Sequence, residues 1–318
     1  MSEPDQQNAK LELVVVGFTG ELRALKLQAR SLRLFAAPGM FERIIYICND
    51  NAFRPFKNFI ETEVKPELGP LAQLVEVVAY ERVLGKRIEK TGWRSQQALK
   101  LLVAQMVQTP QFLILDSKNH FIRPFNTGTF ITPEGKLRVN PVPINPLFRA
   151  HFESACHYFG VESSHNIDTA HPMTTPFIMA TNIARKLIAS VEGREKTSFF
   201  DMFIRDTSLN EFFFYYAYLI ADKKLSDATY EERSRYAVGF FGQAAKSYDR
   251  VLMLIKALDE QDICCTGVHR FIFEAAHPES LTAITAMWRR FGLIETEAEA
   301  AYFQTCDKPM KRKRFILF

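Results

Sequence analysis

The sequence lacks the features that would assign it to several large classes of protein. No uncharged apolar run approaches the roughly 20 residues that a membrane-spanning helix needs; the longest covers residues 212–221. The first ten residues, MSEPDQQNAK, contain no apolar segment typical of a secretion signal. The net charge of +4, from 40 basic and 36 acidic residues, is too small for a general nucleic-acid-binding protein. We therefore expect no nucleic-acid partner.

Cysteine is also scarce and has no pattern typical of a metal site or a disulfide framework. The five cysteines form no CxxC pair, and their number is odd: Cys48, Cys156, Cys264, Cys265 and Cys306. Reduced thiols in a cytosol fit this better than a secreted disulfide scaffold. With no secretion signal, the expected location is cytoplasmic.

A glycine-rich phosphate loop is missing as well. Gly17 and Gly20 are the only glycines in the loop at the end of the first apolar run, and they form neither G-x-G-x-x-G nor a Walker pattern. This disfavours a nucleotidyltransferase, which usually carries a Gly-rich, basic loop at that position.

What the first half of the chain does contain is a regular alternation of apolar runs and helical patterns. The predicted strands cover residues 11–18, 43–48, 75–80 and 112–115, and the predicted helices cover 21–34, 53–64 and 93–107, the last opened by Thr91. Because the strands are apolar throughout, we expect a mostly parallel sheet covered by helices on both faces. The predicted fold class is α/β and Rossmann-like.

The pattern loosens in the second half. We expect a hairpin of residues 127–132 and 136–139 around Glu134 and Gly135. A helix over 147–159, a strand over 175–180, a helix over 182–191, one aromatic helix over 199–221 and a mainly helical end follow. The predicted organisation is a disordered lead (1–9) and a single domain (10–318), with a nucleotide-binding half (10–135), an acceptor half (136–270) and a helical basic tail (271–318).

Polar residues follow the predicted strands, where open parallel sheets bind their ligands. They are Thr19, Asn49, Asp50, Asp116, Ser117, Lys118 and Asn119. If the ligand is a nucleotide, we expect Thr19, Asn49 or Asp50 to contact its nucleoside. The segment after the fourth strand is the most informative, because a carboxylate, a hydroxyl, an amine and an amide occur within four residues. A turn cap at Asp116 with a solvated Lys118 is the competing interpretation.

At these residues the chain resembles a family of bacterial glycosyltransferase-like proteins of the GT-A type. That family carries a W-x-x-Q-x-x-x-K helix before a strand that ends in L-D-x-D. The corresponding residues here are Trp93, Gln96 or Gln97, Lys100, Leu115, Asp116, Ser117 and Lys118. The resemblance extends over residues 11–270 and includes Asn210, Glu211 and the aromatic run to Tyr216, and later Val268, His269 and Arg270.

The resemblance implies a nucleotide-sugar site with one important departure. In GT-A enzymes the two acids of D-x-D hold Mn²⁺ or Mg²⁺ on the donor diphosphate, often with a late histidine. Asp116 matches the first acid and His269 the histidine, so these two would be the metal ligands. Lys118 replaces the second acid, and its ammonium can neutralise a diphosphate directly. Asn119 or His120 remain alternative neutral ligands, so metal dependence stays open.

The remaining expected contacts also follow from the resemblance. Glu211 would be the catalytic base on the acceptor side, sharing a helix face with Ser208, Tyr215 and Tyr218. The alternative is a core glutamate paired with an arginine such as Arg205. Thr174 and Thr175 are further acceptor contacts. Arg94, Gln97 and Lys100 lie on one helix face and offer donors to the phosphates, unless that face is simply solvated.

The sequence therefore predicts a transferase that moves a sugar from a nucleoside-diphosphate donor to a glycan or lipid-linked acceptor. The first alternative is a non-catalytic GT-A-like protein that binds nucleotide or glycan with a degenerate D-x-D motif. A glycoside hydrolase using Asp116 and Glu211 is a weaker one. The basic and aromatic residues 308–318 could contact the inner face of a membrane or pack on their own domain.

Overall fold

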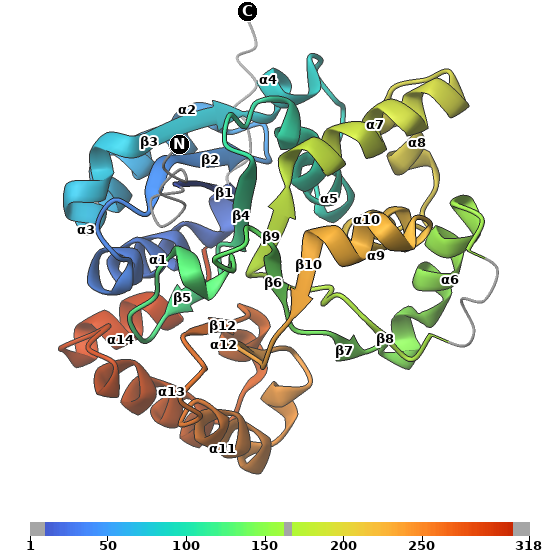
Figure 1. Cartoon of the computed structure of the whole chain (residues 1–318). Coiled ribbons are helices and arrows are strands. Elements are labelled where there is room, and N and C mark those ends of the chain that lie inside the picture. Colours follow the sequence, from blue (N-terminus) through green and yellow to red (C-terminus); the bar gives the residue numbers. More distant parts are fainter. Residues whose placement is uncertain (1–9, 162–166, 308–318) are drawn as a thin grey trace, which may run out of the picture.

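A computed structural model describes residues 10–161 and 167–307 of the chain. Its centre is a five-stranded sheet with the strand order β3-β2-β1-β4-β9 (Figure 1). These strands are β1 (Leu11–Gly17), β2 (Phe41–Cys48), β3 (Val75–Ala79), β4 (Gln111–Asp116) and β9 (Phe177–Ala180). The first four run parallel and β9 runs antiparallel to β4. The predicted α/β class with a mostly parallel sheet is confirmed.

The helices that connect these strands form because each has an apolar face for the sheet. In α1 (Leu22–Phe35), Leu22, Leu25, Ala29 and Leu32 are buried at helical spacing. The helices between the first four strands are α1, α2 (Phe53–Phe59), α3 (Lys65–Leu68), α4 (Tyr80–Leu84) and α5 (Trp93–Leu102), and α7 (Thr181–Glu195) follows β9. A π-helical turn, Ile60–Val64, joins α2 to α3. Gly92, not Thr91, is the N-cap of α5, and its N–H donates to Ser95 Oγ at 2.8 Å.

The predicted hairpin is confirmed only near its turn, where Ile131 forms an antiparallel bridge with Leu137. Its first residues are not a strand. Thr127–Thr129 is a 3₁₀ turn, because the Asn126 side chain accepts the N–H of Thr129. The tight turn is present, with Gly135 at φ 85° and its N–H on Thr132 O. Strand β6 (Leu137–Val139) then pairs in parallel with β10 (Tyr230–Glu232), far along the chain.

The predicted aromatic helix over residues 199–221 is in fact two helices. Ser198 caps α8 (Phe199–Arg205), and Asn210 caps α9 (Glu211–Ile220) by accepting the N–H groups of Phe212 and Phe213. An asparagine with β-region φ and ψ cannot lie inside a helix, so the chain turns between the two. The helix α6 (Arg149–Tyr158) packs on α9, and the small strands β7 (Val142–Pro143) and β8 (Thr169–Ala170) pair antiparallel with each other.

The C-terminal part builds a second apolar core next to α1. This part follows α10 (Lys223–Thr229) in the chain. Its elements are β11 (Ala237–Phe240), β12 (Cys265–Val268), α11 (Tyr248–Ala257), α12 (Phe271–Ala275), α13 (Pro278–Arg290) and α14 (Glu297–Gln304). Strand β12 pairs antiparallel with β5 (Asn119–Phe121), which directly follows β4. Figure 1 shows these elements gathered below the main sheet. The predicted lead 1–9 and the basic tail 308–318 lie outside the described residues.

No helix in the described ranges, 10–161 and 167–307, has both the length and the apolar character that crossing a bilayer requires.

Candidate active site at the carboxyl edge of the sheet

Asp116 is the last residue of β4, at the edge where the parallel strands end. Its backbone is fixed on both sides. The Asp116 N–H donates to Asn119 Oδ1 at 2.8 Å, and Gln28 Nε2 donates to the carbonyls of Asp116 and Asn119 at 2.8 and 2.9 Å. The turn that carries Ser117 and Lys118 is therefore held rigidly between β4 and β5.

Two ammonium groups bind the Asp116 carboxylate. Lys100 Nζ lies 2.7 Å from Oδ1, and Lys118 Nζ forms an ion pair with Oδ2. Burial alone would raise the pKa of Asp116, but the two lysines outweigh it and hold that pKa well below its usual range. The carboxylate is therefore ionised at physiological pH, and the two ammonium groups compensate its negative charge.

Lys100 links Asp116 to Glu211. Its Nζ is 3.2 Å from Glu211 Oε1, and only 5% of the residue is exposed. Burial lowers the pKa of Lys100, yet Asp116 and Glu211 raise it above its usual value overall. In this arrangement the Lys100 ammonium is bound by two carboxylates, and its contact with the donor phosphates stays a prediction.

Glu211 opens α9 and is 3% exposed. Burial raises the pKa of its carboxyl group, and the nearby Lys100 only partly opposes this. Glu211 Oε2 is buried and has no hydrogen-bond partner among the residues described. The partner of Glu211 is Lys100 and not Arg205, because Arg205 is exposed and pairs with Glu195 at 3.1 Å.

Arg94, in the first turn of α5, holds the loop that leads to Glu211. It donates to the carbonyls of Phe203, Asp206 (2.8 Å) and Leu209 (2.5 Å). Its guanidinium also donates to Gln97 Oε1 at 2.7 Å. The solvated alternative is wrong for Arg94, since its guanidinium binds the carbonyls at the break between α8 and α9, and a phosphate contact stays a prediction. Gln97 is buried, and its Nε2 has no partner within the described ranges.

A second set of charges, Glu21 and Arg270, lies near Lys118. Ser117 Oγ donates to Glu21, and burial raises the pKa of Glu21 against the effects of Ser117 and Lys118. Arg270 lies over the Phe18 ring at 5.5 Å and acts electrostatically on Glu21. Glu21 was missed from the sequence, because a glutamate at the start of a helix gives no signal that a residue 96 positions later will bind it.

His269 lies beside this set. Its Nδ1 accepts the N–H of Phe271 at 3.3 Å. Burial, together with the positive charges of Lys118 and Arg270, lowers the pKa of His269 to about 4. The imidazole is therefore neutral near pH 7 and can offer a hydrogen bond to a ligand, but no positive charge.

His120 cannot supply the neutral metal ligand considered from the sequence. Trp288 Nε1 donates to His120 Nε2 at 3.0 Å, so the ring proton is on Nδ1, which donates to Lys118 O at 3.2 Å. Burial lowers the pKa of His120 to about 4. Trp288, which the helical spacing predicts as a packing residue, thus also fixes the tautomer of a histidine next to Lys118.

The buried His120 makes acid stability a test of this contact. The unfolded chain takes up its proton below about pH 6.5, whereas the native state does so only near pH 4, so stability falls as the pH drops through that window. We expect the free energy of unfolding to drop by about 2 kcal/mol more for the wild type than for His120→Gln between pH 7 and pH 5, in urea titrations. Glutamine can keep both hydrogen bonds. The exposed His157→Gln is the control, and a variant that follows the wild-type curve would contradict the assignment.

The polar residues after β1 and β2 serve mainly to connect elements. Asp50 accepts the N–H and the hydroxyl of Thr19 at 2.8 and 2.7 Å. Asn49 accepts from Ser95 Oγ at 2.7 Å and donates to Gly92 O at 2.9 Å, which fixes the start of α5. Thr19 and Asn49 are buried, and their contact with a nucleoside stays a prediction. Asp50 is half-buried and remains a candidate.

Of the three residues expected to contact the acceptor, two are buried and one is exposed. Tyr215 is fully buried in the core, and its hydroxyl accepts the N–H of Ala180 at 3.2 Å. Its contact with an acceptor stays a prediction. Thr175 is buried and donates to Asn119 Oδ1 at 2.5 Å, so it supports the Asp116 turn instead of facing an acceptor. Thr174 is exposed.

A divalent cation does not fit the site in this arrangement. Both oxygens of Asp116 contact lysine ammonium groups, and His269 Nδ1 is bonded to the backbone. Within residues 10–161 and 167–307 no three His, Cys, Asp or Glu side chains group as metal ligands would. Any cation at Asp116 would have to displace a lysine.

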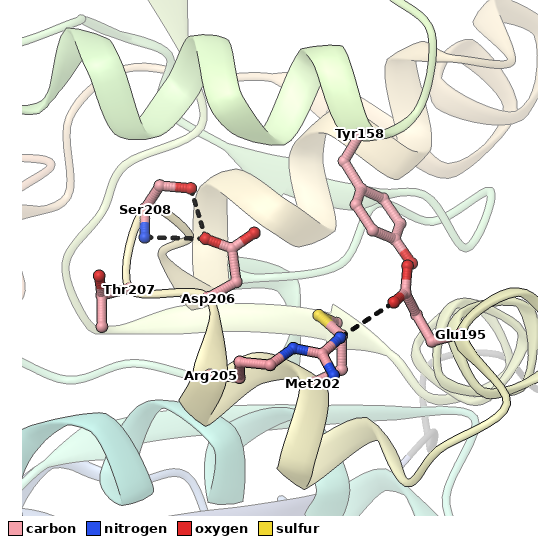
Figure 2. A pocket seen from close by; sticks show the side chains of 7 residues that line it. All are labelled: Tyr158, Glu195, Met202, Arg205, Asp206, Thr207 and Ser208. Carbon is pink, nitrogen blue, oxygen red and sulfur yellow. Dashed lines mark hydrogen bonds and ion pairs between the residues drawn. The ribbon is translucent and has the colours of Figure 1, made fainter.

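A cavity of about 380 Å³ adjoins the loop before Glu211, and Figure 2 shows the side chains that line it. They are Tyr158, Glu195, Met202, Arg205, Asp206, Thr207 and Ser208. Most of its polar groups already bind one another: Glu195 accepts from Tyr158 and Arg205, and Asp206 accepts from Ser208. Ser208 thus belongs to this loop and not to the α9 face on which the sequence placed it.

Comparison with protein families matches residues 16–239 to the family described as "Family of unknown function (DUF6492)". The match covers more than half of the chain and includes Asp116, Lys118 and Glu211. The chain belongs to the DUF6492 family. A search of the curated proteins found no match.

Among solved structures, this DUF6492 member is similar to WbbM, a bifunctional glycosyltransferase. The TM-score is 0.50 at 8% sequence identity, over 95% of this chain and 52% of that one, so the chain spans about half the length of WbbM. The galactosyltransferase LgtC, in complex with donor and acceptor sugar analogues, gives a TM-score of 0.49 at 12% identity, over 92% of this chain and 100% of LgtC. The WbbM similarity shows the fold. This DUF6492 protein has the mixed α/β architecture of GT-A glycosyltransferases, which fits the predicted fold.

Proposed function

We propose that this chain is a glycosyltransferase that uses a nucleoside-diphosphate sugar and transfers the sugar to a hydroxyl of a glycan or lipid-linked acceptor. The supporting observation is the position of Asp116, at the carboxyl end of β4, between the ammonium groups of Lys100 and Lys118 and linked through Lys100 to Glu211. Ligands of open α/β sheets bind at this edge. Polar groups with strongly shifted pKa values gather here from α5, β4 and α9.

In this proposal Lys118 meets the donor diphosphate. Its side chain is the less buried of the two lysines, at 14% exposure against 7% for Lys100. When the donor binds, a phosphate oxygen can replace Asp116 Oδ2 as the partner of the Lys118 ammonium. Lys100 would still compensate the charge of Asp116. A positive charge fixed beside the leaving nucleotide stabilises the charge that develops there in the transition state. Neutral His269 would add a hydrogen bond.

Glu211 would accept the proton of the attacking hydroxyl. Its Oε2 is buried without a partner in the described chain, and its raised pKa makes it a stronger base than a solvated carboxylate. Gln97 Nε2, also without a partner there, would donate to the same substrate. The arrangement does not favour a hydrolase, because Lys100 Nζ contacts both acids and so fills the space where a glycosidic bond would have to lie.

The alternative is a non-catalytic nucleotide- or glycan-binding protein. The ion pairs of Asp116 with Lys100 and Lys118 also favour this alternative, since neither oxygen of Asp116 is free for a metal. The two functions differ in turnover: a transferase releases nucleoside diphosphate in the presence of acceptor, and a binder does not.

The test is a thermal-shift measurement against a panel of nucleoside diphosphates and nucleotide sugars, with EDTA or with manganese. A donor at a concentration 100-fold above its Kd should stabilise the fold by about 2.7 kcal/mol. We expect one nucleotide sugar to do so in EDTA, and Asp116→Ala to abolish the effect. The exposed Asp227→Ala is the matched control. If no nucleotide raises the melting temperature, both the transferase and the nucleotide-binding alternative are wrong.

A further inference from the structure

Exposed apolar side chains are concentrated in one part of the C-terminal region. In the described parts of the chain eight large apolar residues are exposed, and five of them fall between residues 241 and 271. They are Phe241 (41%), Tyr248 (40%), Leu252 (40%), Met253 (59%) and Phe271 (46%). Scattered single residues need no explanation, but a local group of this size marks an interaction surface.

These residues lie on neighbouring elements. Phe241 directly follows β11, α11 packs against β11, and α12 packs against the 3₁₀ turn Ala244–Lys246 that leads into α11. A Cβ built on Gly242 would lie 4.0 Å from Phe271, so the segment after β11 contacts α12 directly. We call the five residues the α11–α12 surface; α11 and α12 are both in the lower part of Figure 1.

Cations accompany this surface. Lys246, Arg250 and Lys256 are exposed, and none of them forms an ion pair in the part of the chain that the structure describes. Two exposed acids lie on these helices, Asp249 in α11 and Glu274 in α12, and neither forms an ion pair among the described residues. The next acids, Asp259 and Glu260, are paired with Arg290 and Arg235. In the described chain the surface therefore carries three unpaired cations, Lys246, Arg250 and Lys256, against two unpaired acids, which leaves a small excess of positive charge beside the apolar side chains.

We propose that the α11–α12 surface docks on membranes that contain anionic phospholipid. Apolar and aromatic side chains flanked by lysine and arginine are the chemistry of interfacial membrane binding, in which the apolar groups enter the headgroup region and the cations contact anionic lipids. The positive charges argue for lipid over a second copy of this chain, because two such surfaces would repel each other.

The surface borders the candidate active site. Lys118 Nζ lies 5.8 Å from the Phe241 ring, and the His269 and Phe271 rings are 4.7 Å apart. A protein docked in this way would hold that edge of the sheet toward the membrane, where a lipid-linked hydroxyl acceptor would be located. Docking itself does not depend on the proposed function.

The test is co-sedimentation of the full chain with vesicles of phosphatidylcholine, with or without phosphatidylglycerol. We expect binding to the anionic vesicles only. Replacing Lys246, Arg250 and Lys256 together with glutamine should weaken it on the order of 100-fold, since each cation near an anionic surface contributes about a factor of five. Leu252→Gln combined with Met253→Gln should weaken it by about tenfold or more.

Matched controls separate this surface from the rest of the chain. Glutamine at the exposed Lys186, Lys223 and Lys224, and at the exposed Leu147, should leave binding unchanged. A further variant replaces Lys311, Arg312, Lys313 and Arg314 with glutamine. If it alone abolishes binding while the α11 variants bind like wild type, the tail is the membrane contact and the proposal is wrong. Absence of binding to anionic vesicles, or equal binding to both vesicles, also overturns it.

Discussion

Lys118→Asp is expected to convert a metal-independent donor site into one that requires a divalent cation. The substitution removes the ammonium that pairs with Asp116 Oδ2 and puts a second carboxylate two residues after the first. In EDTA, we expect nucleotide release from the bound donor to fall by about 100-fold or more, as when one fixed electrostatic contact to the transition state is lost. Manganese should restore a large part of it, because two neighbouring carboxylates form a cation site.

The measurement is nucleoside-diphosphate release with the donor that the thermal-shift panel identifies, in EDTA and in manganese. Wild type should work equally in both. The exposed Lys186→Asp should behave like wild type, and a melting curve should show that Lys118→Asp is folded. Wild-type turnover that disappears in EDTA and returns with manganese would mean that Lys118 has not replaced the metal.

Lys100→Met should cause the largest loss of stability of any single change at the site. Lys100 is the buried ion partner of both Asp116 and Glu211, and methionine keeps the length and helix preference of the side chain without the charge. Removing one partner of a buried ion pair typically costs about 3–5 kcal/mol, because the remaining charge is left without compensation. Urea unfolding at pH 7 measures this directly.

The exposed Lys57→Met in α2 is the control and should stay within about 0.5 kcal/mol of wild type. Glu211→Gln removes one of the two charges that Lys100 compensates. The double variant Lys100→Met/Glu211→Gln should therefore regain part of the lost stability. Glu211→Gln alone should stay folded but lose turnover if Glu211 is the base. A Lys100→Met protein as stable as wild type would show that the triad contributes little.

The order of strands and helices in the first half could be predicted because the information is local. Apolar strand runs and helical spacing from residue 11 to residue 116 each lie within a window of about fifteen residues. The same holds for the polar residues at the strand ends, since parallel strands bring their carboxyl ends to one edge. The break between α8 and α9 was missed because the aromatic residues on both sides continue the helical pattern. Only the Asn210 cap and the carbonyls held by Arg94 end it.

The roles of most site residues depended on contacts between distant segments. Thr19, Asn49, Thr175 and Tyr215 have polar groups at plausible positions in the sequence, but in the fold these groups bind other parts of the chain. Whether a hydroxyl or amide faces a ligand is decided by what packs next to it, and the sequence pattern does not contain that information.

By itself, the sequence determined the α/β class, the position of Asp116 at a strand end and the replacement of the second acid by Lys118. The tertiary structure alone decided what compensates Asp116. Lys100 reaches it from α5, Glu211 joins from α9, and Glu21 binds Ser117 from the segment before α1. A buried charge must be compensated by the groups that the fold brings within contact distance. These groups are far apart in the sequence, so only the tertiary structure determines which they are.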